Sequence, residues 1–139
     1  MLKVTIYHNT ECRFMPYEDG QQLVAVMSHW LPCHAGQDPQ TVADWAYHAF
    51  NADLDMLEPG RGSADGEMTF LAACVYRLLG YRSISVGDAI EVHTGQSDSQ
   101  WLACEPFGWR HITPPSNLSG QPLTAAKVYQ RLTEQPTTR

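Results

Sequence analysis

Two groups of residues in this sequence have the types that support metal or thiol chemistry. The first is the H-x-x-x-C-H group of His29, Cys33 and His34, which combines the imidazole and thiolate ligands that zinc prefers. A structural zinc site needs four ligands, and a catalytic site needs three together with a water. Cys12 or His8 would have to complete the set, and no spacing connects either of them to the group. We therefore expect no bound metal and no cofactor.

The second group is Cys104 with His93 or His111. A cysteine nucleophile needs a neighbouring base or positive charge that lowers the pKa of its thiol, and these residues fall on neighbouring predicted strands. Cys104 and Leu102 lie on one face of an alternating strand, which is typical of a small buried hydrophobic side chain. We expect no enzyme, and a hydrolase that depends on cysteine and histidine, or a metal-binding enzyme, is the alternative.

A polar run, YRSISVGDAIEV at residues 81–92, offers a different kind of site. Gly87 supplies a backbone conformation with positive φ, and Asp88 can bond a nearby backbone N–H as in an Asx-turn. The run is therefore either a structural corner before a strand or a surface that presents polar atoms to a partner. In the second case the binding residues are Arg82, Ser83, Ser85 and Asp88.

The charge of the chain argues against direct binding of nucleic acid. The formal net charge is −6, with 9 basic and 15 acidic residues, and nonspecific affinity for nucleic acid comes mainly from Lys and Arg on phosphates. The sequence also contains no phosphate-loop motif and no dinucleotide-binding glycine motif. A nucleic-acid accessory protein is a second alternative, and it would need a local basic patch built from Arg77, Arg82, Arg110 and Lys127.

The elements that must position these residues follow from hydrophobic periodicity and turn residues. Strands are predicted over residues 2–8, 23–31 (where a helix is the alternative), 89–93 and 101–107, with a short strand within 108–113. Helices are predicted over residues 39–51, 67–80 and 123–134. Residues 51–66, which hold three glycines and a proline, are predicted to be a loop.

Two of the helices are predicted from different signals, capping residues in one and an apolar face in the other. Asp38 at the N-cap and Pro39 at the first position mark the start of the first helix. One face of the second helix is predicted to be inward and consists of Phe70, Leu71, Cys74, Val75 and Leu78. This order of elements predicts an α+β fold, with a small and mostly antiparallel sheet packed by two to three helices.

One domain is expected over residues 1–134, followed by a tail at 135–139. No segment approaches the roughly 18 apolar residues of a membrane span, and the start of the chain lacks a signal peptide. We therefore expect no membrane contact and a cytoplasmic location, in which the four widely spaced cysteines are free thiols.

The runs YRSISVGDAIEV and WLACEPFGWRHI together resemble small uncharacterised proteins of actinobacteria and the related YodL-like domain of mobile genetic elements. The matching positions are Arg82, Ser83, Ser85, Val86, Gly87, Asp88, Gly108 and Trp109. The resemblance implies a role for plasmid or phage genes in counter-defence or transfer, and it implies no catalytic residues. We therefore predict a protein-binding module that docks to an unidentified host or element protein, with Trp109 beside Arg82, Ser83, Ser85 and Asp88 as its binding residues.

Overall fold

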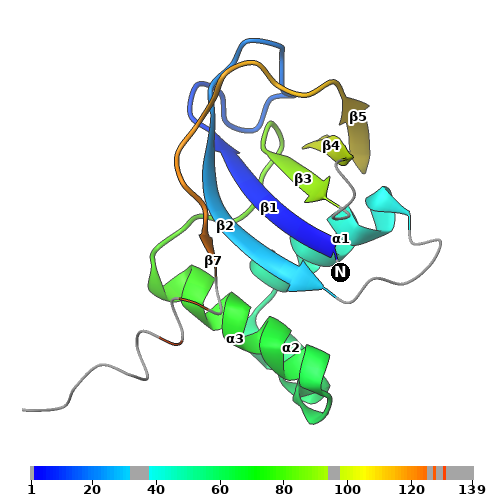
Figure 1. Ribbon diagram of the computed structural model, residues 1–139, viewed down its shortest axis with the longest axis vertical. Coiled ribbons are helices and arrows are strands. Elements are labelled where there is room, and N and C mark those ends of the chain that lie inside the picture. Colours follow the sequence, from blue (N-terminus) through cyan, green and yellow to red (C-terminus); the bar gives the residue numbers. More distant parts are fainter. Residues whose placement is uncertain (1, 32–37, 94–97, 125–126, 128–129, 131–139) are drawn as a thin grey trace, which may run out of the picture.

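The computed structural model describes residues 2–31, 38–93, 98–124, 127 and 130. Two strands come first, and then a helical stretch, and a second group of strands follows (Figure 1). In chain order the elements are β1 (Leu2–Asn9), β2 (Leu23–Leu31), α1 (Pro39–Asn51), α2 (Leu54–Leu57), the 3-10 helix η1 (Glu58–Gly62), α3 (Ala64–Leu78), β3 (Ala89–His93), β4 (Ser99–Cys104), β5 (Trp109–Ile112), β6 (Leu118–Ser119) and β7 (Leu123–Thr124).

The described strands form one curled sheet in the order β5-β4-β3-β1-β2-β6, and β7 also pairs with β2. Every pairing from β5 through β2 is antiparallel, and only the short strands β6 and β7 run parallel to β2. Figure 1 shows α2 and α3 together at the lower end of the view. The α+β class with a small, mostly antiparallel sheet is confirmed.

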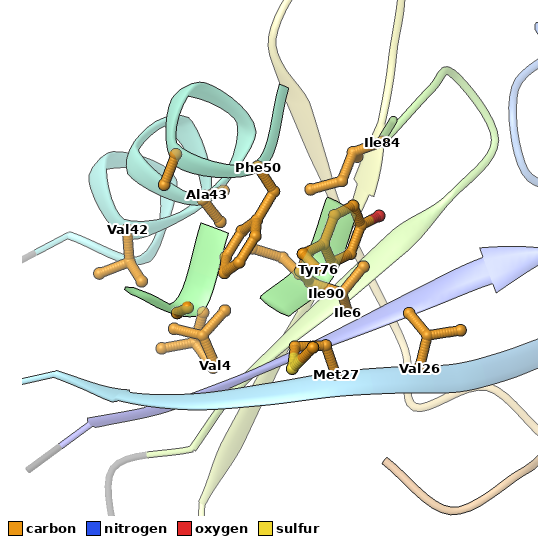
Figure 2. Packing of buried hydrophobic residues seen from close by; sticks show 14 of the residues in the cluster. Val4, Ile6, Val26, Met27, Val42, Ala43, Phe50, Tyr76, Ile84 and Ile90 are labelled. Atoms are coloured by element: carbon orange, nitrogen blue, oxygen red, sulfur yellow. The ribbon is translucent and has the colours of Figure 1, made fainter. Parts of the chain in front are cut away.

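The core lies mainly between the sheet and the helices. Val4 and Ile6 of β1 face Phe50 of α1 and Tyr76 of α3 within one buried cluster (Figure 2). Alternation along β1 sends Tyr7 to the other face of the sheet, where it joins a second, smaller cluster. Full burial of one large aliphatic side chain contributes about 1.5–3 kcal/mol. The cluster on the helix side buries more such side chains than the second cluster, so it contributes more to the stability of the fold.

Local signals account for the first helix, and α1 has the bounds that the sequence predicts. The Asp38 carboxylate accepts a hydrogen bond from the Gln40 amide at 3.3 Å, and Pro39 occupies the first turn. The predicted strands over residues 23–31 and 89–93 also match β2 and β3.

The glycine-rich segment was predicted to be a loop, and this prediction is wrong because α2 and η1 occupy most of it. Ser63 caps α3 by accepting a hydrogen bond from the Gly66 amide at 3.0 Å, so α3 begins at Ala64 rather than at residue 67. A Cβ on Gly66 would lie 1.7 Å from the carbonyl oxygen of Gly60. Close packing of η1 on the first turn of α3 therefore requires glycine at this position.

Three further predictions need correction. Leu78 was expected to point inward, but its side chain is 67% exposed, and the buried face of α3 consists of Phe70, Ala72, Ala73, Val75 and Tyr76. Strand β4 ends at Cys104, because Pro106 and Gly108 form a tight turn. Leu123 and Thr124 pair with β2 as β7 instead of starting a helix.

Most of the predicted helix at 123–134, and the predicted tail at 135–139, lie outside the described residues. In the part of the chain that the structure describes, no helix is both long enough and apolar enough to cross a membrane.

Candidate functional site

Asp88 lies at the end of the polar run, and its side chain is only 1% exposed. Its carboxylate accepts hydrogen bonds from the backbone amides of Asn9 and Ser85, both at 2.8 Å. The Arg82 guanidinium donates to both carboxylate oxygens, at 2.6 and 2.7 Å. Asp88 therefore holds the corner, which consists of residues 82–88, from its buried side. The hydrogen bonds to its carboxylate all come from this chain.

Arg82 joins the corner to the end of β1. Its side chain is 25% exposed, and it also donates to the backbone oxygens of Asn9 at 3.2 Å and Ser83 at 3.0 Å. The hydrogen bonds to Asp88 raise the pKa of Arg82, against the opposing effect of burial. Ser83 is exposed and Ser85 is half-buried, so the surface of the corner carries these two residues and a quarter of the Arg82 side chain.

Gly87 holds the corner against the rest of the sheet. Its φ is +98°, and its amide donates to the Cys104 carbonyl at 3.0 Å, while the Cys104 amide donates to the Asp88 carbonyl at 2.8 Å. A Cβ at Gly87 would lie 2.5 Å from the backbone oxygen of Met15. The corner is thus packed between the loop that follows β1 and the end of β4.

A buried hydrogen-bonded chain lies behind the corner. The Tyr76 hydroxyl donates to the backbone oxygen of Arg82 at 2.5 Å, and the Nε2 atom of His8 lies 2.9 Å from the same hydroxyl. Because the phenol proton is committed to Arg82, His8 is the donor and carries its proton on Nε2. Burial lowers the pKa of His8 to about 4, so its ring is neutral at pH 7.

Trp109 lies close to the corner because Cys104 connects the two. Cys104 bonds to the Gly87–Asp88 backbone and stands opposite Trp109 in the β4–β5 register. The structure therefore brings Trp109 and the predicted residues of the polar run to one end of the sheet. Whether these residues bind a partner stays a prediction.

An open pocket of about 240 Å³ adjoins Trp109. Its lining residues come from α1, from the corner and from the β4–β5 hairpin, and they are Asp44, Tyr47, Val86, Cys104, Glu105, Pro106, Gly108 and Trp109. The Trp109 indole nitrogen donates to Asp44 Oδ1 at 3.1 Å, and the Tyr47 and Trp109 rings meet edge to face with centroids 6.4 Å apart.

Sequence reasoning missed Asp44 and Tyr47 as candidate site residues. Both lie on the face of α1 opposite the buried Val42 and Ala46. An exposed aromatic residue on the polar face of an amphipathic helix is the one sequence signal that could have indicated them.

Large apolar side chains are exposed around the pocket. Phe107, at the tip of the β4–β5 hairpin between two lining residues, is 97% exposed. Phe14 and Met15 are also exposed, and their segment contacts the corner, because the Phe14 amide donates to the Val86 carbonyl at 3.2 Å. Apolar and aromatic side chains are thus exposed at this end of the molecule, and other exposed apolar side chains lie on α2, α3, β6 and β7.

Cys104 lacks the surroundings of an activated thiol. Burial, followed by the nearby charges of Asp88 and Glu105, raises the pKa of the Cys104 thiol to about 11, whereas a nucleophilic cysteine needs a lowered pKa. His93 pairs with Ser99 at the opposite end of β4, and its Nδ1 lies 3.0 Å from the Ser99 hydroxyl. His111 is exposed and stands opposite Leu102.

The H-x-x-x-C-H group is only partly described, since Cys33 and His34 lie outside the described residues. His29 is buried and stacks on Trp45, with ring centroids 5.8 Å apart and planes 12° apart. Burial lowers the pKa of His29 to about 4. Among the residues that the structure places, no three of the His, Cys, Asp and Glu side chains are grouped so that they could hold a metal ion.

The basic residues proposed for a nucleic-acid patch are largely engaged within the fold. Arg82 is paired with Asp88, and Arg77 donates to the backbone oxygens of Ala73 and Ala52. Arg110 pairs with Glu105 at 3.3 Å and donates to the Tyr17 carbonyl at 2.6 Å. Lys127 is exposed.

Comparisons with known proteins give no relative for this arrangement: no family model, no curated protein and no solved structure matches the chain.

Proposed function

We propose that this protein is a binding module that docks to a protein partner through the end of the sheet where Trp109, the pocket and the corner meet. The observation that carries the proposal is Phe107, which is 97% exposed at the tip of a hairpin whose next strand begins with Trp109. Aromatic residues dominate the binding energy of many protein interfaces, and exposed apolar patches mark interaction sites.

The corner supplies the polar part of this surface. Protein interfaces combine an apolar centre with a polar rim, and Arg82, Ser83 and Ser85 present donors and acceptors beside the aromatic residues. In the proposed complex Asp88 acts indirectly, by holding Arg82 and the corner backbone in place.

The wider setting of the proposal comes from the sequence resemblance. We place the protein in the cytoplasm, in association with a plasmid or phage, where it would bind a host or element protein in counter-defence or transfer. The raised pKa of Cys104 gives less support to a thiol hydrolase, and the pairing of Arg82 and Arg110 with carboxylates gives less support to a nucleic-acid accessory role.

The test is affinity purification of the tagged full chain from its native cells, followed by mass spectrometry. Phe107→Asp is the test variant, and Leu78→Asp is its matched control, because Leu78 is also exposed and apolar but lies on α3. A stoichiometric protein retained by Leu78→Asp and lost by Phe107→Asp supports the proposal. Equal retention by both variants, or no partner for the folded wild-type chain, overturns it.

A further inference from the structure

The pocket beside Trp109 has walls of two chemical kinds. Asp44 contributes a carboxylate, Tyr47 and Trp109 contribute aromatic rings, and the lining of this pocket contains no basic side chain. The walls come from α1 and from the β4–β5 hairpin, which are far apart in the sequence and are connected by the hydrogen bond from Trp109 to Asp44 at 3.1 Å.

The walls are held in place before any ligand arrives. The hydrogen bond orients the Trp109 indole and occupies Asp44 Oδ1, and Tyr47 makes an edge-to-face contact with the same indole. On the other wall, the Glu105 amide donates to the Gly108 carbonyl at 3.0 Å across the hairpin turn. A preorganised site loses less conformational entropy on binding.

The electrostatics favour a cation. The partner of Asp44 in this contact is a neutral indole, so the hydrogen bond leaves the negative charge of the carboxylate in place. Glu105 also lines the pocket, but its carboxylate is paired with Arg110 at 3.3 Å, so Asp44 supplies the unpaired negative charge there. The formal charge of the whole chain is −6. Aromatic faces attract cations as well, and tryptophan does so most strongly.

We propose that this pocket receives the guanidinium of an arginine side chain presented by the protein partner. A planar guanidinium can stack on an aromatic ring while its N–H groups bond to a carboxylate, whereas a lysine ammonium does only one of these well. The inference rests on the proposed function, because it names the side chain with which the partner would enter the docking surface.

The probe is Nα-acetyl-L-arginine N-methylamide, titrated at constant ionic strength into the isotopically labelled full chain. The readout is the NMR signal of the Trp109 indole N–H, which is assigned by its loss in Trp109→Phe. We expect a saturable shift with the arginine probe, a weaker response to the lysine analogue, and none to the citrulline analogue, which has nearly the same shape but no charge.

Asp44→Asn is the test variant and should weaken binding of the arginine probe about tenfold, which is the order expected for loss of one charged hydrogen-bond partner. Asp55→Asn is the control, since it removes the same charge from an exposed position on α2 outside the pocket lining. Equal binding of arginine and citrulline probes, equal effects of the two variants, or no saturable shift of the Trp109 signal would each overturn the inference.

The two proposals fail in distinguishable ways. A partner that is lost with Phe107→Asp but kept with Asp44→Asn would overturn the arginine pocket and leave the docking function standing. Specific binding of the arginine probe with no protein partner would overturn the docking function and leave the pocket as a guanidinium site.

Discussion

Arg82 donates to both carboxylate oxygens of Asp88, at 2.6 and 2.7 Å, and the same carboxylate accepts the backbone amides of Asn9 and Ser85. The ion pair therefore joins the two ends of the corner, and hydrogen bonds between both side chains and the Asn9 backbone connect the corner to the end of β1. The position of Arg82, which lies on the proposed docking surface, therefore depends on Asp88, which is buried and cannot contact a partner.

Asp88→Ala should lower the free energy of unfolding by about 3 kcal/mol, because removing one member of a buried pair leaves the other charge and the bonded amides uncompensated. Chemical denaturation measures the change. Glu67→Gln is the control, since it breaks the exposed pair of Glu67 with Arg61 and should cost much less. Equal losses in the two variants would show that the buried pair does not hold the corner.

Gly87→Ala should also destabilise the fold, by about 2 kcal/mol or more, because it combines a positive φ with a clash against the Met15 carbonyl. Gly20→Ala separates the two causes, since Gly20 has a φ of +92° and open space around its Cβ position. The unfolding free energies of both variants measure the difference. If Gly20→Ala lowered the free energy of unfolding as much as Gly87→Ala, the positive φ alone would account for the loss, and the clash with Met15 would contribute nothing.

Stability should fall as the pH is lowered from about 6.5 to about 4. Burial lowers the pKa of both His8 and His29 to about 4, so between these pH values the unfolded chain binds more protons than the folded chain. Each histidine contributes a slope of up to about 1.4 kcal/mol per pH unit. Denaturation at several pH values measures it.

His29→Phe is the matched variant for the pH experiment, because it retains an aromatic ring against Trp45 and removes one titrating group. It should reduce the slope of stability against pH by about half. A slope unchanged from that of the wild-type chain would mean that His29 does not contribute to the acid sensitivity.

Cys104 should resist alkylation in the native protein at pH 7.5, because its thiol is buried and its pKa is raised to about 11. Cys12 is only half-buried and should react first. Mass spectrometry of peptides after iodoacetamide treatment, with and without denaturant, compares the two sites. Labelling of native Cys104 ahead of Cys12 would instead favour the hydrolase alternative.

Several elements could be predicted because their signals are local. Asp38 and Pro39 mark the start of α1, a mostly apolar run marks β2, and apolar–polar alternation marks β3. The prediction of a loop over residues 51–66 was wrong, because the composition of this segment does not distinguish a loop from short helical turns. The glycines of η1 and of the first turn of α3 favour a loop by composition, but packing of the α3 backbone on Gly60 stabilises helical turns there.

The buried face of α3 was only partly predicted for a related reason. Leu78 is more hydrophobic than Ala72, yet it is exposed while Ala72 is buried. Which face of α3 is buried depends on how the helix packs against the rest of the core, and this packing is not recorded in the hydrophobicity of the helix itself.

The sequence by itself determined the α+β class, most of the strands, the first helix and the presence of a turn at Gly87-Asp88. Tertiary structure decided what that turn does, since the carboxylate of Asp88 meets the Asn9 amide across 79 residues of sequence. It also decided the pocket, in which Asp44 and Trp109 meet across 65 residues. Local patterns reflect the periodicity of one segment, whereas burial, pKa and the walls of a site depend on which segments pack together.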